Sequence, residues 1–240
     1  MTIRDAFALS RNVPAVRLAN AIGIERVIEV AHRFGIPHNL PPYLAMALGA
    51  GELTLQEITS AFTVFPNHGL RAEPHFITRV EDYNGTILFD HQTQFEQVLS
   101  PEIAEKMIYL LRSVVERGTA RRARVLGRPL GGKTGTTNDS TDSWFVGFTP
   151  QITAGVWTGY DQKLSLGEKV YGATLALPIW VNFMQEITHD MPVEDFESHY
   201  APVDLNLAQV RMESQATQEG EEESNQPWSV EDIPPPPPNY

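Results

Sequence analysis

The stretch Gly131-Gly132-Lys133-Thr134-Gly135-Thr136-Thr137 is the feature that most constrains this chain. It combines one cation, three hydroxyls and three residues without a side chain, so backbone, charge and hydroxyl donors can all approach one ligand. Two incompatible structures fit it. One is an edge strand that presents Lys-Thr-Gly to an active site. The other is a phosphate loop, because residues 127–134 match the pattern G-x4-G-K-[ST].

The residues on either side of this stretch distinguish the two structures. A phosphate loop needs a buried strand before it and a helix that begins at its Lys-Thr, because the helix N-terminus holds the phosphates. Here the preceding residues, 119–126, are rich in arginine and predict a helix, and the following residues lead into a strand around Trp144. The flanks therefore favour the edge strand and leave P-loop nucleotide binding as a weaker alternative.

Composition and charge divide the chain into two parts. With 240 residues, 42% of them hydrophobic, it can bury one sizeable core. Residues 190–240 hold twelve of the thirty acidic residues but one of the eighteen basic ones, and they end in five consecutive prolines, 234–238. We predict a folded part over residues 1–189 and an acidic, proline-rich tail over 190–240 that is mostly disordered. The folded part is nearly neutral, which argues against a nucleic-acid partner.

Several other classes of site have no support in the residues. The chain has no cysteine, so disulfides and thiolate chemistry are excluded. Its seven histidines form no metal-binding pattern such as His-Glu-x-x-His, and we expect neither a metal nor a cofactor. No apolar run approaches the roughly 20 residues that span a bilayer, and Met1 is not followed by a signal peptide. We therefore expect no membrane contact by this chain itself.

Periodicity and capping signals predict a helical first half. Helices are expected over 3–9, from Pro14 to about residue 22, and over 25–34; another follows the capping box that begins at Thr54. A helix from Pro101 should bury one apolar face, and a last helix over 172–187 should be kinked at Pro178. The inward residues predicted for these two helices are Ile103, Met107, Leu110, Leu111 and Val114, and then Trp180, Phe183, Met184 and Ile187.

Five segments alternate as strands. Residues 74–83 and 86–90 flank Asn84-Gly85, a strong signal for a two-residue hairpin. Residues 130–137, 143–149 and 152–160 predict three successive strands, of which the first contains Lys133. Together with the helices, this pattern predicts an α+β fold with an antiparallel sheet flanked by helices.

Longer matches surround Lys-Thr-Gly and indicate a family. Ser10-Arg11-Asn12 supplies a Ser-x-Asn motif upstream of Lys133-Thr134-Gly135, in the right order and with a helical region between them. Neither motif is specific alone. The wider matches are residues 4–17, Glu116-Arg-Gly-Thr-Ala120, 132–139, 142–150 and Ala176-Leu-Pro-Ile-Trp180. From residue 1 to about 187 the chain resembles the transpeptidase domain of bifunctional class A penicillin-binding proteins. The fold it implies is the penicillin-binding-protein/serine β-lactamase-like transpeptidase fold, incomplete at its N-terminus.

The resemblance implies an activity, partners and a location. Members of the family are serine-type D-Ala-D-Ala transpeptidases joined to a peptidoglycan glycosyltransferase. They cross-link stem peptides through an acyl-serine intermediate, and β-lactams acylate the same serine. The expected partners are therefore D-Ala-D-Ala stem peptides, β-lactams and the missing upstream portion of the same protein. The full-length protein would lie at the periplasmic face of the inner membrane.

The resemblance also implies residue roles. Ser10 would relay a proton toward the leaving nitrogen, Asn12 would orient the catalytic lysine, and Lys133 would supply positive charge opposite Ser10. Thr134 and Thr136 would hold the substrate carboxylate, and the Thr136 N–H would form half of an oxyanion hole. Gly135 would keep the strand open to the stem peptide. For Thr137, substrate contact and plain strand formation stay open as alternatives.

One motif of the family is missing. The nucleophile should lie in Ser-x-x-Lys, but the residues three before the four lysines are Ile103, Leu130, Tyr160 and Leu166. We therefore expect this chain to be inactive alone. A non-catalytic module that binds D-Ala-D-Ala or another carboxylate remains an alternative function, as does a related carboxypeptidase or β-lactamase.

Overall fold

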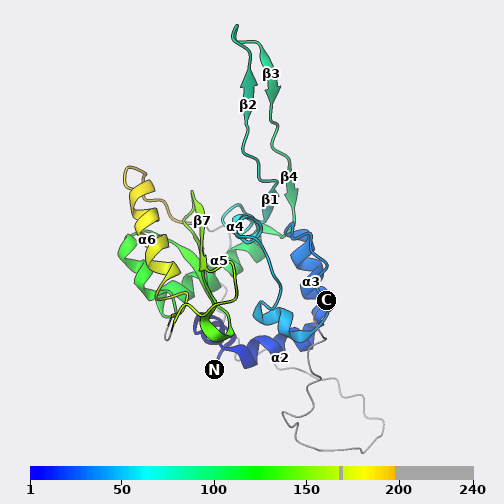
Figure 1. Ribbon diagram of the computed structural model, residues 1–240, viewed down its shortest axis with the longest axis vertical. Helices are drawn as coiled ribbons and strands as arrows, with labels where there is room; N and C mark the ends of the chain where they lie inside the picture. Colours follow the sequence, from blue (N-terminus) through cyan, green and yellow to red (C-terminus); the bar gives the residue numbers. More distant parts are fainter. Residues whose placement is uncertain (168–169, 198–240) are drawn as a thin grey trace, which may run out of the picture. The chain divides into compact units, whose positions relative to one another are not determined.

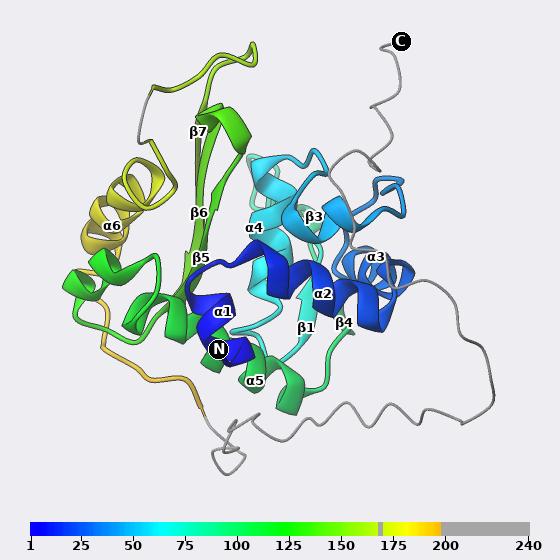
Figure 2. The same cartoon turned by 90° about the horizontal axis from the view of Figure 1, so that it is seen from below.

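The computed structural model describes residues 1–167 and 170–197, and these include three helices at the start of the chain (Figures 1 and 2). They are α1 (Ile3–Ala8), α2 (Asn12–Ile22) and α3 (Ile24–Arg33). The Thr2 hydroxyl caps α1 by accepting from the Asp5 N–H at 3.1 Å. Gly23, at φ 87°, separates α2 from α3 in a conformation that favours glycine. The helices confirm the predictions within one or two residues.

Helix α4 (Leu55–Thr63) follows a short 3₁₀ helix, η1 (Leu44–Leu48). Thr54 and Glu57 form the predicted capping box, in which Thr54 Oγ1 accepts from the Glu57 N–H and Glu57 Oε2 accepts from the Thr54 N–H at 2.8 Å. The two contacts satisfy backbone donors that a helix N-terminus leaves free, which fixes where α4 begins.

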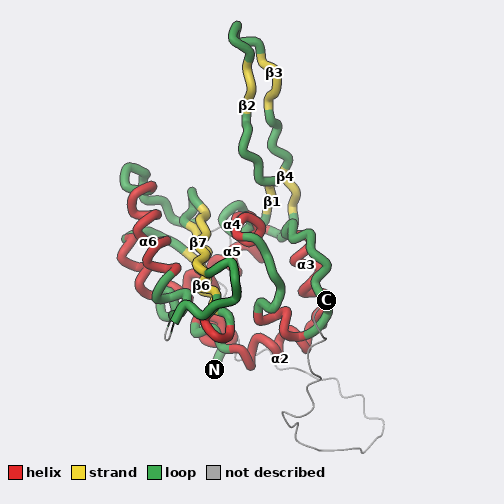
Figure 3. Tube along the Cα trace, in the orientation of Figure 1, coloured by secondary structure: helices red, strands yellow, loops and turns green. Residues whose placement is uncertain are grey.

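A hairpin arm, residues 73–94, projects from the body of the protein (Figures 1 and 3). It carries β2 (Arg79–Glu81) and β3 (Ile87–Asp90) and joins the body through the pair β1 (Leu70–Ala72) and β4 (Phe95–Gln97). The turn lies at the predicted Asn84-Gly85, but the Asp82 N–H donates to the Thr86 carbonyl at 2.9 Å, so three residues, 83–85, form the loop instead of the predicted two. The strands are also shorter than the predicted 74–83 and 86–90. All residues of β2 and β3 are exposed, so no packed face extends the pairing.

Helix α5 (Pro101–Glu116) begins at the predicted N-cap, Ser100. Leu111 and Val114 are buried as predicted, but Ile103 is 47% exposed, and that part of the prediction was wrong. The buried set also contains Ala104, Ile108, Ser113 and Val115. A 3₁₀ helix, η2 (Arg121–Leu126), follows where an ordinary helix was expected.

The central sheet has the antiparallel order β5-β6-β7. Its strands are β5 (Gly131–Thr136), β6 (Asp142–Phe148) and β7 (Thr153–Gly159), all at the predicted places. The short η3 (Asn138–Ser140) connects β5 to β6. In the register, Lys133 lies opposite Val146 and Val146 lies opposite Gly155. Helices thus surround an antiparallel sheet, and the predicted α+β class is confirmed.

Helix α6 (Ala176–Ile187) covers one face of this sheet. Trp180 is fully buried, packs edge-on against Phe145 at 5.0 Å and donates Nε1–H to the Ala154 carbonyl at 2.9 Å. The helix begins later than predicted, so Pro178 lies in its first turn, where its missing N–H breaks no intrahelical bond. The predicted kink was therefore wrong. Of the predicted inward residues, Trp180 and Met184 are buried, but Phe183 and Ile187 are exposed.

The packed part of the chain extends past residue 189. Arg112 of α5 forms an ion pair with Asp195 at 3.1 Å, and the Phe196 ring packs against Phe148 at 5.7 Å between centroids. These contacts bring the start of the predicted tail onto a cluster of buried side chains formed by Phe65, Ile108, Leu111 and Phe148. The rest of that tail, 198–240, lies outside the described residues.

Candidate active site

Ser10 lies in the tight link between α1 and α2. Its φ is 52°, in the left-handed region that a residue with a side chain rarely adopts. Two backbone hydrogen bonds hold it there, from the Ser10 N–H to the Phe7 carbonyl at 3.1 Å and from the Arg11 N–H to the Ala6 carbonyl at 2.9 Å. The turn leaves the Ser10 side chain exposed. Backbone strain of this kind is often stored at functional sites.

Lys133, on β5, reaches Ser10 across 123 positions of sequence. Its Nζ donates to Ser10 Oγ at 2.8 Å and to the Thr134 carbonyl at 3.0 Å. Burial lowers the pKa of the Lys133 ammonium from 10.5 to about 8. The pair therefore joins a hydroxyl to a lysine whose proton is held far less tightly than that of a lysine in water.

The backbone of β5 has one edge free of β6. The Thr137 N–H donates to the Asp142 carbonyl at 3.3 Å, which makes these two residues a hydrogen-bonded pair. Hydrogen-bonded and non-bonded pairs alternate along an antiparallel ladder. The register therefore points the N–H and C=O of Thr134 and Thr136 away from β6. No strand among the described residues pairs with that edge, and Lys133 Nζ contacts it at the Thr134 carbonyl.

The hydroxyls of this stretch have partners within the protein. Thr134 Oγ1 lies 2.7 Å from Thr119 Oγ1, and Thr136 Oγ1 accepts from the Gly172 N–H at 3.0 Å. Thr137 Oγ1 accepts from the Asp142 N–H at 2.9 Å and so fastens the β5–β6 connection. Of the two interpretations of Thr137, strand and turn formation is the one with contacts in this structure.

Gly135 allows other parts of the chain to approach closely. A Cβ at Gly135 would lie 3.1 Å from the Trp144 Cβ, and a Cβ at Gly172 would lie 2.6 Å from the Gly135 carbonyl oxygen. Gly135 thus leaves room for the Trp144 side chain of β6, and Gly172 lets the segment before α6 lie against β5. Sequence reasoning gave no role to Gly172 or Thr119. Thr119 lies in the family match Glu116–Ala120, but no spacing connects either residue to Lys133.

Asn12 is the first residue of α2 and its side chain is exposed. It follows Ser10 by two positions on the same link, so the Ser-x-Asn motif and Lys133 come from the two sides of one site. The structure gives no contact between Asn12 and Lys133.

The phosphate-loop interpretation was wrong. Lys133 and Thr134 lie inside β5, and the element before them is η2 rather than a buried strand. No helix begins at Lys133-Thr134, so the N-terminal dipole and free N–H groups that would hold phosphates are not at this position.

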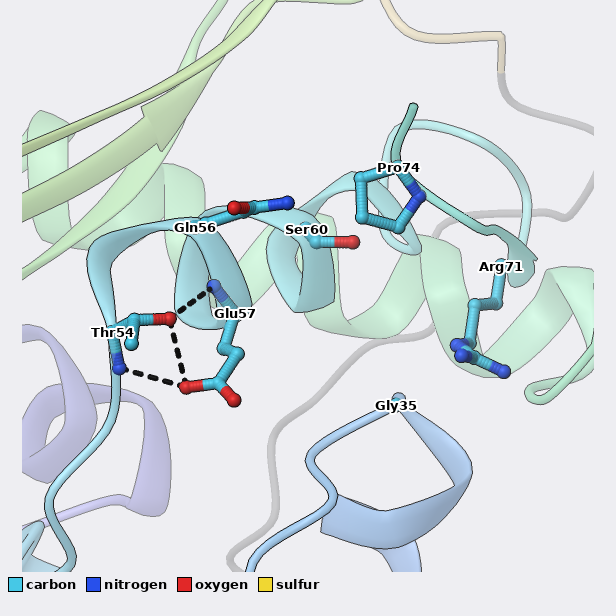
Figure 4. A pocket seen from close by; sticks show the side chains of 7 residues that line it. All are labelled: Gly35, Thr54, Gln56, Glu57, Ser60, Arg71 and Pro74. Atoms are coloured by element: carbon cyan, nitrogen blue, oxygen red, sulfur yellow. Dashed lines mark hydrogen bonds between the residues drawn. The ribbon is translucent and has the colours of Figure 1, made fainter. Parts of the chain in front are cut away.

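A separate pocket of about 240 Å³ lies beside α4 (Figure 4). Gly35, Arg71 and Pro74 line it together with the first two turns of α4. Its charged groups are already paired: Glu57 contacts His38 at 3.0 Å, and Arg71 contacts Glu96 at 3.1 Å. Hydrogen bonds from Thr54 are the main cause that lowers the pKa of Glu57. This pocket shares no residue with the Ser10–Lys133 pair.

Comparison with known proteins identifies the family to which a chain with this fold and this Ser10–Lys133 pair belongs. Residues 1–163 match the family described as the penicillin binding protein transpeptidase domain. The chain belongs to this family, as the motifs around Ser10 and Lys133 predicted, and its fold is the transpeptidase fold.

Within this family, the chain is similar to proteins named penicillin-binding protein 1A. The chain is 46% identical over 197 residues to penicillin-binding protein 1A of Aquifex aeolicus, and 37% identical over 220 residues to that of Rickettsia bellii. The alignments cover 82% of this chain but 27% and 28% of those proteins, so the chain spans little more than a quarter of their length.

Solved structures of penicillin-binding proteins are similar to this chain as well. The crystal structure of penicillin-binding protein 1A from Haemophilus influenzae matches with a TM-score of 0.78 and 27% identity, over 82% of this chain and 36% of that one. PonA1 from Mycobacterium tuberculosis, in complex with penicillin V, matches with a TM-score of 0.74 and 25% identity, over 83% of this chain and 59% of that one.

Proposed function

We propose that this chain forms part of a peptidoglycan D,D-transpeptidase that acts through an acyl-serine intermediate. The observation that carries the proposal is the 2.8 Å contact between Lys133 Nζ and Ser10 Oγ at the free edge of β5. Family membership supports the reaction class, and the relatives named penicillin-binding protein 1A support β-lactams as ligands of the complete site.

In this proposal Ser10 and Lys133 move a proton. A lysine with a pKa of about 8 is close enough to neutrality to exchange its proton near physiological pH. The Ser10 hydroxyl can accept from Lys133 and donate onward to the leaving nitrogen of the D-Ala-D-Ala bond. Protonated Lys133 also supplies positive charge for the terminal carboxylate of the substrate.

The free edge of β5 would align the substrate. Its outward backbone groups, those of Thr134 and Thr136, can hydrogen-bond an extended stem peptide that lies alongside as an added strand. The Thr136 N–H, which the register turns away from β6, is the donor we assign to the oxyanion hole. The hydroxyls of Thr134 and Thr136 would reach the carboxylate by exchanging their present partners.

The attacking serine is not assigned within this sequence. None of the four lysines is preceded at three positions by serine. The proposal therefore requires a nucleophile and its lysine base from a Ser-x-x-Lys segment that this sequence does not contain, and the activity is expected where that segment is joined to it. For such an assembly we also propose the periplasmic face of the inner membrane; in the part of the chain that the structure describes, no helix has the length and apolar character to cross a bilayer.

Fluorescent penicillin tests the proposal. The chain alone should stay unlabelled. The same chain fused to the segment that precedes the matched region in the Aquifex aeolicus relative should be labelled. In the fusion, Lys133→Ala and Ser10→Ala should each slow labelling by at least about a hundredfold, the usual contribution of a positioned acid or base. Lys163→Ala is the matched control, because that exposed lysine only pairs with Glu52 at the surface.

Two results would contradict the proposal. Labelling of the isolated chain would show that the nucleophile lies within residues 1–240. Labelling of the fusion at an unchanged rate in Lys133→Ala would remove Lys133 from the site. Saturable binding of a D-Ala-D-Ala peptide by a fusion that penicillin never labels would instead support the non-catalytic binding module.

A further inference from the structure

The segment between α5 and η2 contacts both sides of the candidate site. Its residue Thr119 donates its backbone N–H to the Ala8 carbonyl at 3.1 Å, and its hydroxyl lies 2.7 Å from that of Thr134. Ala8 is fully buried and precedes Ser10 by two residues, while Thr134 adjoins Lys133. One residue thus joins the helix that leads to Ser10 and the strand that carries Lys133.

Gly118 makes the first of these contacts possible. A Cβ on Gly118 would overlap the Ala8 carbonyl oxygen and would lie 2.8 Å from the Ala8 carbonyl carbon. Real Cβ atoms essentially never approach backbone so closely, and here the obstacle is backbone rather than a flexible side chain. Any side chain at position 118 therefore has to push α1 and α5 apart.

An ion pair marks the same junction. Arg117 contacts Asp5 of α1 at 3.3 Å, so three consecutive residues, Arg117, Gly118 and Thr119, lie against α1. Both partners of this ion pair are more than one-third exposed, so it adds little to stability by itself. The close Gly118 contact and the two Thr119 bonds hold α1 against the α5–η2 segment.

We propose that Gly118 and Thr119 are positioning residues that set the separation between the Ser10 hydroxyl and the Lys133 ammonium. The Ser10–Lys133 bond closes a ring whose other side runs through Thr134, Thr119 and Ala8. Moving α1 outward lengthens the bond and admits water to the ammonium. Losing the Thr119 hydroxyl frees β5 from the ring while leaving the backbone bond to Ala8 in place.

The test follows the titration of Lys133 in the full chain, by NMR of the lysine Cε carbons. The chain has four lysines, and Lys133→Met identifies the signal. A role of the Ser10–Lys133 contact in catalysis rests on the proposed transpeptidase function. The titration itself needs no substrate, so it tests the positioning role independently. Lys133 should titrate at about 8 in the unchanged chain. In Gly118→Ala the pKa should rise toward 10.5 by at least about one pH unit, a tenfold tighter proton, because hydration favours the charged form.

Matched variants keep the proposal open to refutation. Gly127→Ala is the control, since its Cβ would meet nothing within 4 Å. Gly127 has a positive φ of 69° and Gly118 does not, so the control carries a backbone cost of its own and a titration of Lys133 that stays at about 8 in it is the more telling. If Gly118→Ala does not fold, the Thr119 pair decides: Thr119→Val should raise the pKa and Thr119→Ser should preserve it. A folded Gly118→Ala with Lys133 still at about 8, or identical titrations for the two Thr119 variants, would overturn the proposal. Shifted titrations in these variants, together with a fusion that penicillin fails to label, would retain the positioning role and refute the transpeptidase function.

Discussion

The pH dependence of stability should reveal how strongly Lys133 is buried. Its pKa falls from 10.5 to about 8 on folding because burial disfavours the charged form. At about 1.36 kcal/mol for each pH unit, this corresponds to about 3 kcal/mol. Below pH 8 the lysine is charged in both states, and the folded protein carries the full cost. Replacing Lys133 by Met should therefore raise the free energy of unfolding at pH 7, and the gain should shrink as the pH rises.

The sign follows from the protons bound in each state. Between pH 8 and 10.5 the unfolded chain holds a proton on Lys133 that the folded chain has lost, so the free energy of unfolding rises with pH in this window. Lys133→Met lacks this rise. At pH 7 the variant should be more stable by as much as about 3 kcal/mol, less what the bonds to Ser10 and Thr134 contribute. The advantage should disappear by about pH 10.5.

Urea denaturation at a series of pH values between 6.5 and about 10.5 measures both free energies. Subtracting the free energies of unfolding of the unchanged chain and of Lys133→Met at each pH removes the contribution of tyrosines and other groups that titrate in the same range. Lys163→Met provides the control, because Lys163 is exposed and its substitution should give a flat difference. A difference between the unchanged chain and Lys133→Met that does not vary with pH would refute the burial of the Lys133 ammonium.

Two further predictions concern the scaffold. Thr54→Ala should lower the free energy of unfolding by about 1 kcal/mol because it removes the N-cap of α4, whereas Thr54→Ser should preserve it; equal stability of both variants would contradict the capping role. Trp180→Phe should cost about 1–3 kcal/mol, because it removes the bond to the Ala154 carbonyl and leaves unfilled space around a fully buried side chain. Trp157→Phe loses a bond to Asp142 at a partly exposed site and should cost less; the reverse order in thermal or urea denaturation would show that the buried donor is unimportant.

Local signals in the sequence were enough to place most elements. The caps at Thr54 and Ser100 and the turn at Asn84-Gly85 depend on residues within a few positions of one another, and all three were predicted. The helix faces were less accurate. Periodicity gives the direction of an apolar face, but the width that is covered depends on neighbouring elements, so Ile103 and Phe183 are exposed although they lie on predicted inward faces.

The candidate site likewise combines residues that short motifs predict with residues that only the packing brings together. Ser10 and Lys133 each lie in a short motif whose order could be read, and the expected proximity is present in the structure. Thr119 lies in the matched stretch Glu116–Ala120, but its contact with β5, like that of Gly172, crosses the chain and follows no spacing, so neither contact could be predicted. Only the packing of α5 and of the segment before α6 against β5 reveals them.

The tip of the hairpin arm is a suitable place to attach a label. The arm joins the body through β1 and β4, and a side chain at Gly85 would meet nothing within 4 Å. A fluorophore or a small inserted tag at this tip would therefore report on tumbling and encounters without touching the core. The exposure of Tyr83, 97%, offers an intrinsic optical probe at the same place.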